Sequence, residues 1–201
     1  MIDRSLPPSS VGRKVIEMEK QKLGPQPLLY PLPVVLVGAN VDGRANFQAV
    51  SWCGIASFSP PAVTVGLQRG RHTLKGLLEH KTFSVNVAST GLLEKVDYCG
   101  IHSGKDVDKS GIFQVFYGVL ETAPLIDECP ISLECTVIES RDLGSHILII
   151  GEIVETYISR ECLKDGKPDA EMIDPIMISL GTMTYHCLGM EIGKAYQVGK
   201  R

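Results

Sequence analysis

The sequence predicts a mainly β fold, an antiparallel barrel with two or three short helices. Apolar runs of strand length recur along the chain, and tight-turn signals such as Asp42-Gly43 separate them. In the second half, two long strand-like runs are joined by one turn, as in an antiparallel hairpin. Parallel βαβ folds need a more regular alternation of strands and helices. Neither a G-x-G-x-x-G motif after a strand nor a P-loop motif occurs in the sequence.

Length and composition are those of an ordinary globular domain. The 201 residues are enough for one domain with a sizeable core, and 44% of them are hydrophobic. A net charge of −3 gives no reason to expect nucleic acid or an anionic membrane as a partner. No apolar run approaches the roughly 20 residues of a membrane helix, and the N-terminus lacks the apolar core of a signal peptide. We therefore expect a cytoplasmic protein.

The six cysteines predict neither a metal site nor a disulfide framework. No two of them form a C-x-x-C pair, and the spacing of Cys129 and Cys135 fits no common zinc pattern. In a cytosolic protein of this size, we expect reduced thiols that pack as small apolar residues. The six are Cys53, Cys99, Cys129, Cys135, Cys162 and Cys187.

The first elements can be taken in chain order. Residues 1–30 are expected to be peripheral, with a short amphipathic helix around residues 15–23 that prolines end. The run Val34–Val37 predicts a buried strand, and the D-G pair after it turns the chain back into an antiparallel partner. Alternating apolar residues then predict a half-buried strand over residues 63–67.

Two helices and a loop are predicted next. Leucine spacing indicates a helix over residues 73–80, and a strand follows over residues 82–87. Ser89-Thr90 is expected to cap a second helix, which Gly100 stops. A polar loop with two lysines, residues 102–109, comes after this helix.

The second half of the chain is rich in β signals. Alternation predicts a strand over residues 131–137, and residues 146–157 return after a turn as a long second strand. Residues 164–167, K-D-G-K, form another turn. Residues 177–180 and 185–190 are expected to be short closing strands or irregular structure near a ligand.

A segment of small and polar residues, 45–59, is the first candidate binding site. Small residues let a ligand approach the backbone closely, and serine and asparagine side chains offer hydrogen bonds. The candidates in it are Asn46, Ser51, Trp52, Cys53, Ser57 and Ser59. The tryptophan has an alternative interpretation, because a lone tryptophan is more often a core residue.

The second candidate site is the R-x-R-x-T turn that leads into the first helix. Arg71 and Thr73, with Arg69 and His72 beside them, come at a helix N-terminus. The first amides of a helix are unpaired and its dipole favours negative charge, so these residues suit an anion such as a phosphate. A solvated loop is the alternative, and the residues alone do not decide between the two.

The order of these features resembles that of a known family. A D-G turn, Asn46, S-W, S-F-S-P-P, R-x-R-x-T and an F-S-V-N-V strand follow one another. This order resembles the flavin reductase-like family of FMN-binding split barrels, most closely its flavoredoxin branch. The likeness implies a Greek-key split barrel over residues 31–192, an N-terminal extension over residues 1–30 and a tail over residues 193–201. It also implies FMN as the cofactor.

The resemblance adds site residues that the sequence pattern does not single out. It places Lys109 on the flavin, although a solvated loop is the ordinary interpretation of such a polar run. It places His146 facing the cofactor, where a cation would stabilise the reduced flavin, and makes it the candidate catalytic residue. It also places Tyr185 close to the ring, and Trp52, six residues after Asn46, in the site.

The resemblance leaves three functions open. In the first, NAD(P)H gives a hydride to FMN, and the electrons pass to free flavin or another acceptor. In the second, a redox partner protein loads FMN one electron at a time, and no nicotinamide site exists. In the third, the chain only binds flavin. No catalytic triad or pair of carboxylates stands out, which fits a protein whose chemistry is the flavin's own.

A homodimer with FMN at or beside the interface is also expected. A small barrel fills its interior with side chains, so the flavin must lie on the outside, where a second copy can cover it. The exposed edge of a split barrel is a further reason to pair. Within one chain, Lys109→Ala and Asn46→Ala are expected to weaken FMN binding without unfolding the domain, because their segments have few apolar residues.

Overall fold

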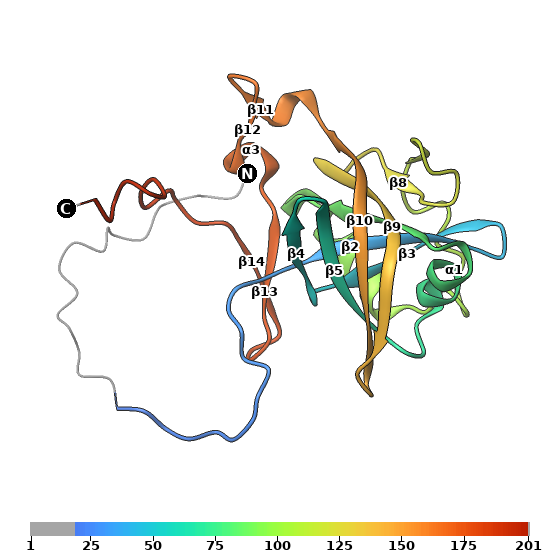
Figure 1. Ribbon diagram of the computed structural model, residues 1–201, viewed down its shortest axis with the longest axis horizontal. Helices are drawn as coiled ribbons and strands as arrows, with labels where there is room; N and C mark the ends of the chain where they lie inside the picture. Colours follow the sequence, from blue (N-terminus) through green and yellow to red (C-terminus); the bar gives the residue numbers. More distant parts are fainter. Residues whose placement is uncertain (1–18, 201) are drawn as a thin grey trace.

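The centre of the fold is one seven-stranded antiparallel sheet, which a computed structural model describes together with the rest of residues 19–200 (Figure 1). The strand order is β3-β2-β6-β9-β10-β5-β4. The strands are β2 (Val35–Val41), β3 (Arg44–Val50), β4 (Cys53–Phe58), β5 (Pro61–Gln68), β6 (Thr82–Val87), β9 (Ile131–Asp142) and β10 (His146–Ile158). Neighbours in the sheet such as β6 and β9 are distant in the chain, as in a Greek key. The predicted mainly β, antiparallel split barrel is confirmed.

Local turn chemistry builds the hairpin of β2 and β3. Asp42 and Gly43 both have positive φ, 51° and 77°, as the two central residues of a type I′ turn require. This turn matches the twist of the strands and sets their register, with Val37 opposite Gln48. It thereby brings Asn46 onto β3, the strand at one end of the sheet order.

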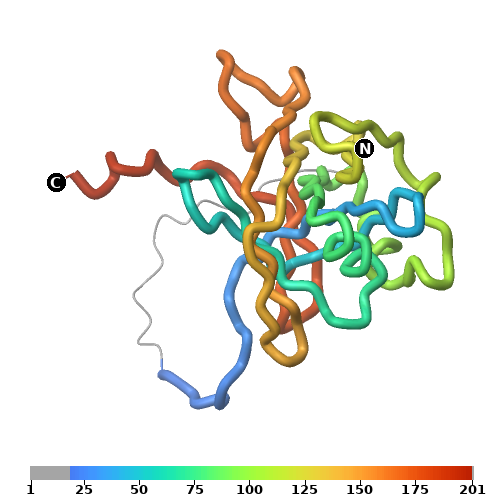
Figure 2. Tube along the Cα trace, turned by 45° about the vertical axis from the view of Figure 1, so that its right-hand side comes forward, coloured from blue at the N-terminus to red at the C-terminus, as the bar shows by residue number. Residues whose placement is uncertain are grey.

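The two longest strands, β9 and β10, form the long hairpin that the sequence predicts. Their turn projects from the barrel, as the gold and orange loop of Figure 2 shows. β10 also pairs with β5, and His146, its first residue, lies opposite Gln68. The start of β10 therefore lies beside the end of β5, from which the chain leads into the first helix.

The helices are short. They are α1 (His72–His80), α2 (Leu93–Ile101) and α3 (Ala170–Ile173), with 3-10 turns η1 (Thr90–Leu92) and η2 (Arg160–Cys162). The expected stop at Gly100 is wrong, because α2 continues to Ile101. Gly100 packs against β3, since a Cβ there would lie 3.4 Å from the Cβ of Ala49, an ordinary van der Waals contact. The expected cap at Ser89 is also wrong, since its side chain caps neither η1 nor α2.

A second, three-stranded sheet resolves the alternative left open for the end of the chain. Its order is β1-β13-β14, with β1 (Leu32–Pro33), β13 (Ile176–Ser179) and β14 (Thr184–Cys187). Residues 177–180 and 185–190 thus contribute short strands. Two small hairpins complete the fold: β7 (Val115–Phe116) with β8 (Leu125–Ile126), and β11 (Leu163–Lys164) with β12 (Lys167–Pro168). The second of these contains the predicted K-D-G-K turn.

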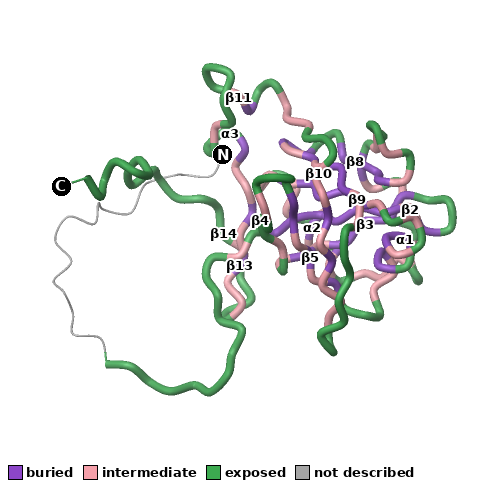
Figure 3. The backbone as a smooth tube through the Cα atoms, viewed as in Figure 1, coloured by how far each residue is buried: buried purple, intermediate pink, exposed green. Residues whose placement is uncertain are grey.

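The core lies on both faces of the large sheet, where the tube in Figure 3 is purple. One cluster gathers apolar side chains of six strands with those of α1, and includes Val37, Val65, Leu67, Phe83 and Ile149. The other lies between the sheet and α2, and includes Leu36, Phe47, Val96, Cys99 and Ile126. With both faces covered by side chains of the chain, the barrel has a filled interior, and a large ligand must bind outside it.

The two ends of the described chain are exposed. Residues 19–25 run away from the barrel, and so do the residues after β14, whereas residues 26–29 return beside it (Figures 1 and 2). Of the helix predicted around residues 15–23, residues 15–18 lie outside the described residues, and residues 19–23 are irregular rather than helical. Within residues 19–200, we find no helix that is long and apolar enough to cross a membrane.

Candidate functional site

Four cavities adjoin one another on the surface of the barrel, each sharing lining residues with the next. We call them the apolar cavity (about 550 Å³), the aromatic cavity (about 260 Å³), the inner polar pocket (about 10 Å³) and the outer polar groove (about 380 Å³). Trp52 and His146 line the first two, and Gln48 and Arg71 line the second and third. Asn46 and Lys109 line the third and fourth. The row therefore passes from an apolar end, through the cationic inner polar pocket, to a groove lined by charges of both signs.

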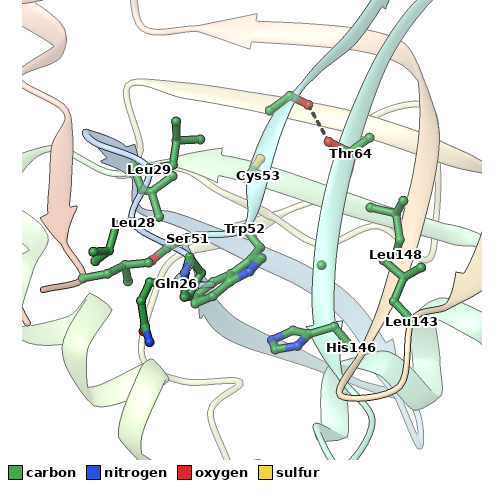
Figure 4. A pocket seen from close by; sticks show the side chains of 15 residues that line it. Gln26, Leu28, Leu29, Ser51, Trp52, Cys53, Thr64, Leu143, His146 and Leu148 are labelled. Carbon is green, nitrogen blue, oxygen red and sulfur yellow. Dashed lines mark hydrogen bonds between the residues drawn. The ribbon is translucent and has the colours of Figure 1, made fainter. Parts of the chain in front are cut away.

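The apolar cavity lies between the N-terminal segment and the end of the β9–β10 hairpin. Figure 4 shows leucines 28 and 29 on one side of it, and Leu143 and Leu148 on the other. Ser51 and Cys53 also line it. Burial raises the pKa of the Cys53 thiol to about 11, so this cysteine is protonated at neutral pH and does not act as a thiolate.

Trp52 and His146 form the wall between the apolar and aromatic cavities (Figure 4). Their rings are stacked, with centroids 5.3 Å apart and planes inclined by 20°. Gly66 of β5 lets the tryptophan lie close to the sheet, because a Cβ there would be 3.0 Å from the Cβ of Trp52. The Gly66 amide also donates a 2.7 Å hydrogen bond to the Trp52 carbonyl. These contacts hold a flat aromatic surface beside the cavity.

Tyr185 of β14 lines the aromatic cavity together with Asp97 of α2. The Tyr185 hydroxyl donates a 2.7 Å hydrogen bond to Asp97 Oδ1. Burial and this bond to a carboxylate raise the pKa of Tyr185 to about 12. The phenol therefore remains a neutral hydrogen-bonding group, and the pair ties the small sheet to the helix that carries Asp97.

The inner polar pocket lies at the N-terminus of α1. Arg71 is the N-cap residue of this nine-residue helix, no side chain caps it, and no acidic residue occupies its first turn. The buried Thr73 hydroxyl accepts a 2.7 Å hydrogen bond from Asn46 Nδ2. Gly104 presses onto this pair from the loop after α2, since a Cβ there would overlap with Asn46 Oδ1. Amides, a hydroxyl and cations thus converge on one helix N-terminus.

Arg71 and Lys109 are both held by the last turn of α2. Arg71 Nη1 donates to the Gly100 carbonyl at 3.2 Å, and Lys109 Nζ donates to the Cys99 and Phe47 carbonyls at 3.0 Å each. Lys109 is only 3% exposed, and Asn46 is 5% exposed. Each makes buried hydrogen bonds between distant segments, so both are more enclosed than the few apolar residues of their own segments indicate. That the domain folds without either side chain stays a prediction.

The charges of this region repel one another. Burial lowers the pKa of Lys109, and the nearby Arg71 charge lowers it further. Burial also lowers the pKa of His72, with Lys75, Lys105 and Lys109 acting in the same direction and Asp42 opposing them. An anion bound among these groups would relieve the repulsion and favour their charged forms.

Gln48 was not singled out by the sequence. Its Oε1 is the one buried side-chain oxygen or nitrogen between residues 19 and 200 that has no hydrogen-bond partner. Gln48 comes two residues after Asn46 on β3, so the two side chains lie on the same face of the strand. That period of two was the signal available in the sequence. Asp97 and His102, which line the aromatic cavity and the inner polar pocket, were missed as well.

The structure brings most of the predicted site residues together. The four cavities are lined by Asn46, Ser51, Trp52, Cys53, Arg71, His72, Thr73, Lys109, His146 and Tyr185. Ser57 and Ser59 line none of the four and lie at the β4–β5 turn, where the Ser59 amide donates to Ser57 Oγ at 3.2 Å. Over residues 19–200, no cluster of histidine, cysteine and carboxylate side chains could hold a metal ion. Direct contact of any of these residues with a flavin stays a prediction.

Comparison with known proteins gives a consistent result. A family model described as "Flavin reductase like domain" matches residues 28–177. The crystal structure of flavoredoxin from Methanosarcina acetivorans is 41% identical, with a TM-score of 0.88 over 91% of this chain and 98% of that one. Flavoredoxin of Desulfovibrio vulgaris (Miyazaki F) is 32% identical, with a TM-score of 0.84 over 90% and 100%. The FMN reductase (NADH) RutF of Pseudomonas syringae is 28% identical over 56% of this chain and 62% of that protein.

Proposed function

We propose that this chain, which belongs to the flavin reductase-like family, holds FMN in the row of cavities and works as a flavin oxidoreductase of the flavin reductase or flavoredoxin type. One observation carries the proposal: the aromatic cavity adjoins the inner polar pocket, which is lined by cations, and Gln48 and Arg71 line both. FMN has the same polarity, with a flat ring at one end and a phosphate at the other.

The residues present fit this cofactor. At the cationic end, the uncapped N-terminus of α1, Arg71 and the Thr73 hydroxyl offer the donors that a phosphate needs. At the other end, the stacked rings of Trp52 and His146 offer a flat wall. None of the residues that line the inner polar pocket is a carboxylate that could balance these cations. A phosphate in the adjoining outer polar groove, which is large enough for it and shares His72 and Lys109 with this pocket, would supply negative charge beside these cations.

FMN, when bound, supplies hydride and single-electron transfer. The chain's own part is to bind, to orient and to place charge. His146 Nδ1 lies 2.9 Å from Ser145 Oγ, which leaves Nε2 for a ligand. His146 can therefore donate a hydrogen bond to the polar edge of a ring that lies against Trp52, and such a donor favours negative charge on that edge. Lys109 and Arg71, held by α2, keep the phosphate end in place.

Two electron sources are supported by different relatives. The RutF relative is named as an NADH-dependent FMN reductase, which supports a nicotinamide donor and a free flavin or other small acceptor. The flavoredoxins cover nearly all of this chain at higher identity, which supports electron exchange with a redox protein. A flavin-binding module without turnover is the remaining alternative.

One experiment separates these alternatives. The purified chain is loaded with FMN and mixed anaerobically with NADH or NADPH, while the flavin absorbance is followed. Rapid bleaching supports the reductase. Bleaching by a reduced redox protein but by neither nicotinamide supports the carrier. A chain that binds FMN but transfers electrons in neither test is a binding module, and a chain that binds no FMN contradicts the proposal as a whole.

The working unit is a homodimer. β4 is the last strand in the order of the large sheet, so its outer edge has no partner strand in residues 19–200. Its apolar residues Ile55 and Phe58 are 67% and 96% exposed. An exposed apolar edge strand favours pairing with another chain, and a second copy could also cover the ring. Residues 31–192 form the FMN-binding domain of each copy, with residues 1–30 and 193–201 as extensions.

A further inference from the structure

Gln48 has a buried side-chain oxygen without a hydrogen-bond partner. It is 7% exposed, and its Oε1 lacks a hydrogen-bond partner although every other buried side-chain oxygen or nitrogen of residues 19–200 has one. Such an atom costs free energy of folding, and native proteins retain few of them. A buried, unpaired acceptor on a side chain that lines a binding cavity indicates a donor that arrives with the ligand.

The position of Gln48 narrows the identity of that donor. Gln48 and Arg71 are the two residues that line both the aromatic cavity and the inner polar pocket. They therefore lie where the two ends of the row meet. In FMN, the ring and the phosphate are joined by the ribityl chain, which carries hydroxyl groups.

A hydroxyl fits this junction better than any other group of the cofactor. It donates one hydrogen bond and accepts others, whereas arginine only donates. One ribityl hydroxyl can thus donate to Gln48 Oε1 and accept from the Arg71 guanidinium. We infer that Gln48 accepts a hydrogen bond from a ribityl hydroxyl of FMN and so selects flavins by their sugar-alcohol chain. This inference rests on the proposed function.

The competing explanation is a buried water. The inner polar pocket has a volume of about 10 Å³, which is close to the minimum for one water molecule. A water there could satisfy Gln48 without any ligand. In that case the glutamine would support the fold of the apoprotein and would not distinguish one flavin from another.

The test uses the full chain, the variant Gln48→Met and the control Gln114→Met, which changes an exposed glutamine outside the four cavities. The probes are FMN and its analogues in which one ribityl hydroxyl is replaced by hydrogen. Loss of one neutral hydrogen bond should weaken FMN binding to Gln48→Met by about threefold to tenfold. One deoxy analogue should bind the parent more weakly by the same factor and bind parent and variant equally. Gln114→Met should bind like the parent.

Two results would overturn the inference while leaving the proposed function intact. One is unchanged FMN affinity in Gln48→Met. The other is an equal loss for every probe, including lumiflavin, which has the ring alone. If Gln48→Met does not fold, the parent still decides: equal affinity for FMN and for each deoxy analogue excludes a hydroxyl donor. A parent that binds no flavin refutes the proposed function itself, and this inference with it.

Discussion

Arg71 and Lys109 donate hydrogen bonds to two successive carbonyl groups of α2, those of Gly100 and Cys99. The negative end of α2 thus holds two cations beside the positive end of α1, where Arg71 is the N-cap. Neither carbonyl neutralises a full charge. The arrangement fixes the two side chains without a ligand, so the phosphate of the proposed cofactor would meet donors that are already ordered.

Arg71→Met should weaken FMN binding by about tenfold to a hundredfold, because one charge-assisted hydrogen bond is worth about 1.5–3 kcal/mol. Riboflavin lacks the phosphate, so its affinity should change much less. Quenching of flavin fluorescence measures both. Arg69→Met is the matched control, since Arg69 is bound to Asp142 and the Gly144 carbonyl and lines none of the four cavities. Equal losses for FMN and riboflavin would show that Arg71 does not bind the phosphate.

Lys109→Met should lower both stability and FMN affinity. The methionine fits the buried stem but leaves the Phe47 and Cys99 carbonyls without their donor. An unsatisfied buried polar group costs about 1–3 kcal/mol, so urea unfolding of the apoprotein should shift by that amount. Lys105→Met, at an exposed lysine of the same loop, should leave stability unchanged. An apoprotein as stable as the parent would mean that water replaces the ammonium.

Much of the fold follows from local signals. Asp42-Gly43 predicts the β2–β3 hairpin because both residues tolerate positive φ, and the alternation in residues 131–137 predicts β9 because one face is buried. The strand of residues 82–87 was predicted with the bounds that the structure has. These elements are decided by their own sequence, so the sequence is sufficient for them.

Burial in the site depends instead on segments that meet only in three dimensions. Lys109 stands in a polar loop that looks solvated, yet the loop folds over the outer edge of β3 and buries the ammonium against the Phe47 carbonyl. Gly100 looks like a helix stop, but it lies inside α2, where it faces Ala49 of β3. For Gln48, the period of two indicates only that it shares a strand face with Asn46, and its unpaired acceptor is visible only when its neighbours are placed.

His72 should make the stability of the apoprotein sensitive to pH. Burial lowers its pKa from 6.5, so the unfolded chain binds a proton more readily than the folded chain in the window just below 6.5. The stabilisation from a neutral His72 is therefore present above pH 6.5 and is lost as the pH falls through the lowered pKa. Thermal unfolding at pH 7.5 and pH 5 should show a larger loss for the parent than for His72→Gln. An identical loss in both proteins would contradict the prediction.

The homodimer can be tested at the exposed edge of β4. With FMN bound, light scattering should report about 44 kDa, twice the 21.9 kDa of one chain. Phe58→Asp puts a charge on the most exposed apolar residue of that edge and should shift the protein toward the monomer at equal concentration. FMN affinity should fall with it if the second copy covers the ring. Val119→Asp, at another exposed apolar residue in the loop between β7 and β8, should leave the dimer intact. A monomer of about 22 kDa that still holds FMN tightly would refute both the dimer and the shared site.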